Sequence, residues 1–112
     1  MRKWLLALCV TGILAAVALS GCSKRVARCT GPEDNPEHHY LRGMEALEAG
    51  KLDVARAKFE RSDFCDEKFA KGYAGLAIVL AAEAKGMTDA GFRKVAVERS
   101  LVNLEKAKKL YL

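Results

Sequence analysis

The N-terminal segment limits what the rest of the chain can fold into. Two basic residues follow the first methionine, and an uncharged, mostly apolar run then extends from Trp4 to Leu19. A helix that spans a membrane needs about 20 apolar residues, so this run is short for a permanent anchor and suits the core of an export signal. The run ends in Leu19-Ser20-Gly21-Cys22, after which the chain becomes polar and charged. We therefore expect residues 1–21 to be a leader that is removed.

The stretch Leu19-Ser20-Gly21-Cys22 resembles the lipobox of bacterial lipoproteins, with a large aliphatic residue, two small ones and the cysteine. The resemblance implies cleavage before Cys22, a diacylglycerol and an acyl chain on its sulfur, and anchoring in a bacterial membrane. Ser23 replaces the Asp that favours inner-membrane retention in Gram-negative members. In such a bacterium the expected location is the outer membrane, facing the periplasm. The alternatives are an ordinary export signal with a chance cysteine and an uncleaved anchor.

The cysteine count predicts one disulfide. Cys9 would leave with the leader and Cys22 would carry lipid, so Cys29 and Cys65 remain. Exported chains reach an oxidising compartment, where such pairs form disulfides. A Cys29–Cys65 bridge would stabilise the domain by about 3–4 kcal/mol on the chain-entropy model. The alternative is two unpaired thiols.

The charge balance argues against a nucleic-acid partner. The full chain has 19 Lys and Arg against 14 Asp and Glu, and loss of Arg2 and Lys3 leaves a mature net charge of +3. The basic residues are mixed with acids, whereas a phosphate-binding tract gathers them on one face. Lys24 and Arg25 would lie next to the lipid, where each can favour anionic headgroups by about 1 kcal/mol. The alternative, which we favour, is a plain solvated tether.

The mature chain reads as a linker, residues 22–36, followed by an all-α domain, residues 37–112. Asn35 can cap the first helix, and Pro36 suits its first position. No segment alternates as a half-buried strand does. The expected helices run from Pro36 to about Gly50, from Leu52 to about Ser62, from about Phe69 to Lys85, and from Thr88 or Asp89 to about Tyr111.

Each expected helix carries an apolar stripe at helical spacing. We expect the stripe of the third helix to be buried and the other stripes to lie on one side of their helices. Residues Asp63 to Glu67, which include Cys65, should form a polar connection. The stripes are Tyr40, Met44 and Leu47; Leu52, Ala55, Phe59 and Ser62; Tyr73, Leu76, Ala77, Leu80 and Ala84; and Val97, Leu101, Leu104, Ala107 and Tyr111.

The first two helices resemble a tetratricopeptide repeat. Gly43 takes the small position where the two helices of a hairpin cross closely, and Gly50 takes the turn. Ala55 and Phe59 match the Ala-x-x-x-Phe element, and Ser62 takes the later small position. The sequence departs from the pattern at three positions, where His39 replaces Trp, Arg42 replaces Leu and Glu67 replaces Pro.

The last two helices resemble a second copy of the repeat. Ala77 lies 34 residues after Gly43, but Leu104 lies 45 residues after Phe59. We therefore expect an insertion of about 11 residues, around 86–95, that lengthens the last helix. The alternative is a generic four-helix bundle.

No residue pattern indicates an enzyme or a bound metal. His38 and His39 are adjacent, so their side chains diverge, and the chain lacks the i, i+4 histidine pair and the Cys-x-x-Cys element of zinc sites. There is also no nucleophile elbow and no phosphate-binding glycine loop. The alternative function that stays open is a small periplasmic ligand or metal carrier that uses Cys29, Cys65, His38 and His39.

The expected function is a non-catalytic adaptor for proteins of a cell-envelope or secretion complex. Helical repeats usually need about three copies for a stable core, so two leave burial to be completed by an envelope partner, by self-association, by the long last helix acting as a cap or by the disulfide. The repeat resemblance implies partner contacts on the first helix of each hairpin. Polar candidates there are His39, Arg42 and Lys71.

Overall fold

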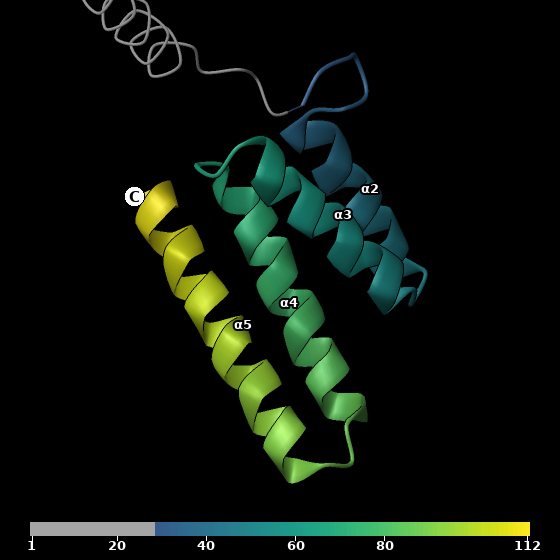
Figure 1. The fold of residues 1–112 in the computed structure, drawn as a ribbon, viewed down its shortest axis with the longest axis vertical. Helices are drawn as coiled ribbons and strands as arrows, with labels where there is room; N and C mark the ends of the chain where they lie inside the picture. Colours follow the sequence, from purple (N-terminus) through teal and green to yellow (C-terminus); the bar gives the residue numbers. More distant parts are fainter. Residues whose placement is uncertain (1–28) are drawn as a thin grey trace, which may run out of the picture.

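The computed structural model describes residues 29–112, which form four helices and no strand (Figure 1). The helices are α2 (Pro36–Glu48), α3 (Leu52–Cys65), α4 (Ala70–Gly86) and α5 (Ala90–Tyr111). The predicted all-α class is confirmed. The lipobox at Cys22 and the linker up to Arg28 lie outside the described residues. None of the described helices is both long enough and apolar enough to span a bilayer.

Local chemistry sets the helix ends. The side chain of Asn35 accepts a hydrogen bond from the His38 amide at 2.8 Å, and Pro36 starts α2. Gly50 turns the chain with a φ of +74°, which glycine adopts without strain. Asp89 caps α5 by accepting from the Phe92 amide at 3.0 Å.

The second helix is longer than predicted. We expected a polar connection from Asp63 onward, but α3 continues to Cys65. No glycine or proline interrupts this stretch, and the Asp66 amide still bonds to the Ser62 carbonyl at 3.1 Å. The helical ladder therefore continues until the backbone of Asp66 becomes extended. The last helix has 22 residues against 14 in α3, so it is the longer of the two, as expected.

The helices form two hairpins that lie side by side. Helix α4 packs against α3 and also against α2, so it occupies the groove of the first hairpin. Helix α5 packs against α4 alone among the described helices, and it flanks α4 on the side away from α3 (Figure 1). The first hairpin is therefore covered, whereas none of residues 29–112 forms a helix that covers the second in the same way.

The core is centred on Phe59, which is fully buried. Two glycines make room for its ring: a Cβ added at Gly43 would lie 2.6 Å from the ring, and one at Gly75 would also collide with it. The close approach expected at Gly43 is thus present. The full cluster comprises Ala46, Ala55, Phe59, Leu76, Val79 and Leu80.

The predicted burial of the α4 stripe is confirmed, whereas most of the α5 stripe is exposed. All five expected residues of α4 are buried, and Val79 joins them. In α5, Val97, Leu101, Leu104 and Tyr111 are instead 43% to 82% exposed, and of the expected stripe only Ala107 is buried. Helix α5 has α4 as its single neighbour among the described helices. Its small residues Ala96 and Ala107 are buried, and its larger apolar side chains are left exposed beside that contact.

Candidate functional site

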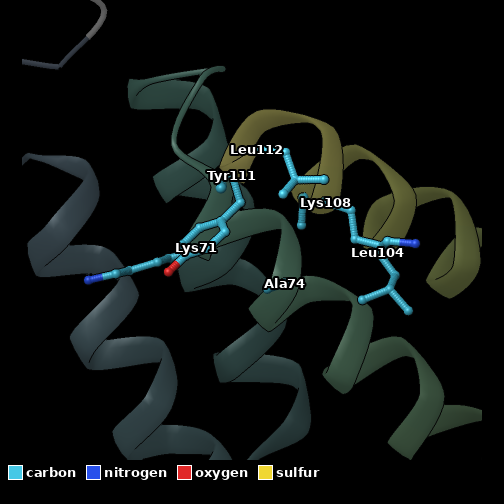
Figure 2. A pocket seen from close by; sticks show the side chains of 8 residues that line it. Lys71, Ala74, Leu104, Lys108, Tyr111 and Leu112 are labelled. Carbon is cyan, nitrogen blue, oxygen red and sulfur yellow. The ribbon is translucent and has the colours of Figure 1, made fainter.

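An apolar groove separates the start of α4 from the end of α5 (Figure 2). Its volume is about 430 Å³. Alanine side chains leave room between the two helices, and Leu104 and Tyr111 form its α5 side. The lining residues are Ala70, Lys71, Ala74, Leu104, Ala107, Lys108, Tyr111 and Leu112.

A second recess continues the groove along the same face. It measures about 290 Å³ and lies between the end of α4 and the start of α5. Two of its α4 residues, Ala81 and Lys85, are seven and eleven positions after Ala74, so they share one side of that helix. Its lining residues are Ala81, Ala84, Lys85, Arg93, Val97, Ser100 and Leu101. We call the two recesses together the α4/α5 groove.

The α4/α5 groove has basic rims. Lys71 and Lys108 line one end, Lys85 and Arg93 line the other, and no acidic residue lines either recess. Lys71 is engaged with the first hairpin, since its Nζ lies 3.7 Å from a Glu37 carboxylate oxygen. Both Lys71 and Lys108 keep more than half of their side-chain surface exposed. The groove therefore combines an apolar floor with positive edges.

The opposite side of α5 is more polar. A recess of about 450 Å³ lies among α3, α4 and α5, and its wall includes the Arg56–Glu83 ion pair at 3.2 Å. Asp89 and Arg99 also line it. Its charges are of both signs, unlike those of the α4/α5 groove.

The linker is fastened to the first hairpin through Asp34. One carboxylate oxygen lies 2.7 Å from Nε2 of His39, and the other accepts a hydrogen bond from Nη2 of Arg61 at 2.9 Å. These hydrogen bonds, that of Arg61 first, lower the pKa of Asp34 to about 2. Asp34 therefore stays ionised throughout the physiological range.

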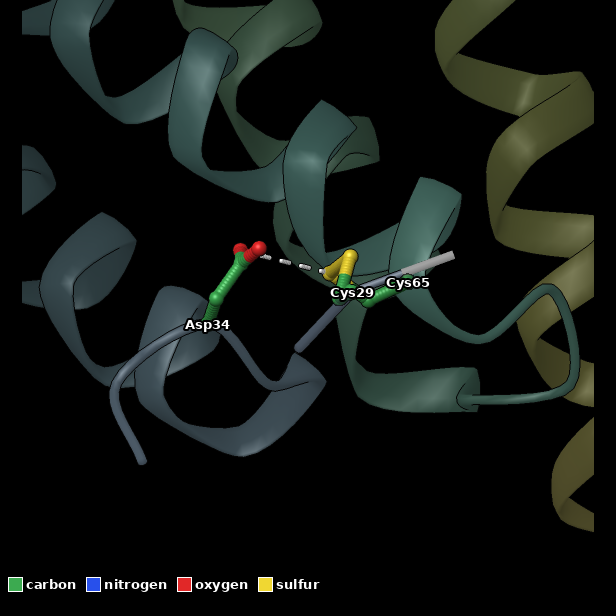
Figure 3. A group of neighbouring side chains, drawn as sticks. All are labelled: Cys29, Asp34 and Cys65. Carbon is green, nitrogen blue, oxygen red and sulfur yellow. Dashed lines mark hydrogen bonds between the residues drawn. A yellow bond between two sulfur atoms is a disulfide. The ribbon is translucent and has the colours of Figure 1, made fainter. Parts of the chain in front are cut away.

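The predicted Cys29–Cys65 disulfide is present beside Asp34 (Figure 3). The two Cα atoms are 5.2 Å apart, a usual separation for a bridged pair. The bridge joins the linker to the last residue of α3. Together with the Asp34 contacts, it fixes the linker from residue 29 onward at one end of the bundle.

The same three residues form the one group of metal-type ligands among residues 29–112. Ligand atoms of Cys29, Asp34 and Cys65 lie within 4.8 Å of one another. Zinc binds thiolates, whereas both sulfurs here are bonded to each other. A metal could use this group only after the disulfide is reduced. His39 points at Asp34 and not at a sulfur.

The polar residues expected to contact a partner lie in different surroundings. The side chain of His39 is 12% exposed and bound to Asp34, and Arg42 pairs with Glu45 at 2.9 Å on the surface of α2. Lys71 alone borders the α4/α5 groove. Sequence reasoning missed Lys108 and Leu104 as groove residues. The available signal was the large number of apolar residues in α5.

One carboxylate lies in an unfavourable position. Asp63 packs against Gly72, where an added Cβ would collide with its Oδ1, and neither of its carboxylate oxygens has a hydrogen-bond partner. Burial raises the pKa of Asp63 to about 7, while the charge of Lys106 opposes that rise. Asp63 therefore lowers the stability of the fold when it is ionised.

Comparison with known proteins adds no relative from which a function could be transferred. The lipobox and the tetratricopeptide resemblance stay predictions, and the function is argued from geometry alone. No protein-family model, curated protein or solved structure matches the chain.

Proposed function

We propose that this protein is a membrane-anchored lipoprotein that acts as a non-catalytic adaptor in a cell-envelope or secretion complex. Lipid on Cys22 would hold it at the membrane. The α4/α5 groove would bind a segment of a partner protein. The observation that carries the proposal is the groove itself, because its walls expose Leu101, Leu104 and Tyr111 along one face.

The groove suits binding better than catalysis. Exposed apolar surface that is gathered in one recess and edged by polar groups is typical of interaction sites. Leu104 is 46% exposed, and the buried residues of its helix are the alanines Ala96 and Ala107. Covering these side chains would supply the burial that the second hairpin lacks.

The disulfide strengthens the adaptor proposal by shortening the tether. The chain from Cys22 to Cys29 spans at most about 25 Å when fully extended. An anchor at Cys22 would thus keep the bundle close to the bilayer, with the disulfide end nearest to it. The C-terminus of α5 lies at this same end (Figure 1), so a partner in the groove would also be held near the membrane.

Chemical crosslinking in intact cells, followed by purification of the tagged protein, tests the proposal. Four versions are compared: wild type, Cys22→Ala, Leu104→Asp and the matched control Val102→Asp. Val102 is on the same helix, is 67% exposed and lines none of the three recesses. Mass spectrometry of the N-terminal peptide shows whether Cys22 carries lipid.

We expect wild type and Val102→Asp to give the same crosslinked partner in the membrane fraction. Leu104→Asp should lose it because a charge enters the groove, and Cys22→Ala should lose membrane retention. Equal yields from Leu104→Asp and Val102→Asp would contradict the assigned surface. An unmodified Cys22 in the wild type would contradict the anchor.

A further inference from the structure

We propose that the occupant of the α4/α5 groove is a single amphipathic helix of a partner protein, with acidic residues flanking its apolar stripe. This inference rests on the proposed function and specifies its ligand. Three features carry it: how the first hairpin is covered, the dimensions of the groove and the charge of its rims.

The first hairpin binds a helix in the groove between its own two helices, because α4 packs against both α2 and α3. The apolar stripe of α2 packs against the core there through Tyr40, Met44 and Leu47. The residues 34 positions later are Ala74, Ile78 and Ala81. Ala74 and Ala81 line the open groove, and Ile78 between them is 52% exposed. The second hairpin thus has residues at the positions that contact a helix in the first hairpin, but no helix within residues 29–112 covers them.

The second helices of the two hairpins, α3 and α5, show the same correspondence between residues that contact a helix and residues that line the open groove. Phe59 of α3 contacts α4 at Gly75, where no Cβ would fit. The residue 45 positions later is Leu104, which lines the open groove. Ala107 likewise lies 45 positions after Ser62. The side chain of Ser62 is fully buried. The two walls of the groove, α4 and α5, therefore correspond to α2 and α3, which contact a helix in the first hairpin.

The groove is long and shallow enough for a helix. Its two recesses extend from Ala70 to Lys85, almost the whole of the 17-residue α4, which is about 25 Å of helix. Alanines at 74, 81 and 107 let a backbone approach closely. A helix that docks in such a groove does so through apolar residues at positions i, i+3, i+4 and i+7.

The rims select the charge of the occupant. Lys71, Lys85, Arg93 and Lys108 lie on both edges with no acid among the lining residues. No ion pair among residues 29–112 involves Lys85 or Arg93. Acidic residues beside the apolar stripe would face these cations, and such complementarity favours association and excludes basic helices.

A second copy of the chain fits less well. Helix α5 carries six Lys or Arg against two Glu, so two α4/α5 faces would repel each other. Helix α2 is acidic, but Leu41 is its only large apolar residue that is well exposed. One such residue cannot fill a groove with two recesses.

Titration with synthetic helices tests the inference. Two fluorescein-labelled 18-residue peptides share one Leu/Ala stripe and differ only in flanks of Glu or of Lys. Each is titrated by fluorescence anisotropy into the full chain held in phosphatidylcholine nanodiscs. We expect the Glu peptide to bind at least tenfold more tightly than the Lys peptide. Leu104→Asp should weaken its binding at least tenfold and Val102→Asp less than twofold, and the double variant K85E/R93E should abolish the preference because it leaves two cations and two acids on the rims.

Equal binding of the two peptides, or equal losses in Leu104→Asp and Val102→Asp, would overturn the inference. So would a failure of the Glu peptide to bind. Sedimentation equilibrium adds a third check: a wild-type dimer that Leu104→Asp dissociates makes a second copy the occupant. Vesicle co-sedimentation adds a fourth: a loss of binding to phosphatidylglycerol vesicles in Leu104→Asp alone assigns the groove to lipid. In each case the crosslinked partner from cells can persist, so the adaptor proposal is judged separately.

Discussion

Replacing Asp63 with Asn should stabilise the protein above pH 7 and have little effect near pH 4.5. The pKa of Asp63 rises from 3.8 to about 7 on folding, so between these values the folded state binds a proton that the unfolded state has released. Stability therefore falls as pH rises through this window. Asn has the size of the protonated acid and cannot ionise, so it removes the loss.

The size of the effect follows from the shift. Three pKa units correspond to about 4 kcal/mol. The side chain is only partly buried, and Lys106 offsets some of the cost, so solvent screening reduces the expectation to about 1–2 kcal/mol. For a domain of this size, this corresponds to a rise in Tm of about 5–10 °C.

Chemical denaturation at pH 4.5 and pH 8 measures the difference between the two proteins. Asp53→Asn is the matched control, since Asp53 is an exposed acid on the same helix and its replacement should change stability by less than about 0.5 kcal/mol at both pH values. If Asp63→Asn were no more stable than wild type at pH 8, or if its gain were the same at pH 4.5, the reasoning on burial would be refuted.

Three further predictions concern the core and the linker. Gly75→Ala should lower the free energy of unfolding by about 1–3 kcal/mol, because the new methyl group meets the Phe59 ring. The control Gly86→Ala meets no other atom and should be neutral or stabilising. Thermal denaturation compares the two variants, and equal changes in stability would contradict the packing of Phe59. Replacing Cys29 and Cys65 together by Ser should lower the free energy of unfolding by about 3–4 kcal/mol, given their separation of 36 residues. Chemical denaturation measures this difference, and an unchanged free energy of unfolding would show that the disulfide does not restrict the unfolded chain. Zinc added to the oxidised protein should leave Tm unchanged, because the two sulfurs are bonded to each other; a stoichiometric zinc-dependent rise would favour the carrier alternative.

Periodicity and capping predicted most of the fold. The four helices begin where Asn35, Leu52, Phe69 and Asp89 indicated, and the small position at Gly43 is a true close crossing. These features depend on local chemistry and on helical spacing, which a single sequence carries. The disulfide was also predicted, because the expected loss of Cys9 with a leader and lipidation of Cys22 would leave only Cys29 and Cys65 to pair.

The site was harder to predict because exposure depends on neighbours. The stripe of α5 has the same spacing as that of α4, and periodicity alone assigns both to a core. Only the arrangement shows that α4 has neighbours on both sides and α5 on one. Similarly, the spacing of His39 and Cys65 from Asp34 gave no sign that these residues would meet.

Site-specific photo-crosslinking from position 104 tests the central claim, that the α4/α5 groove binds a partner helix at the membrane. A photoreactive residue replaces Leu104 in living cells, and the same residue at Val102 is the control. The account predicts a discrete adduct from position 104, whose mapped peptide is an acidic amphipathic helix, and little or none from position 102. Equal labelling from the two positions, or an adduct that maps to a second copy of this chain or to lipid, would contradict the account.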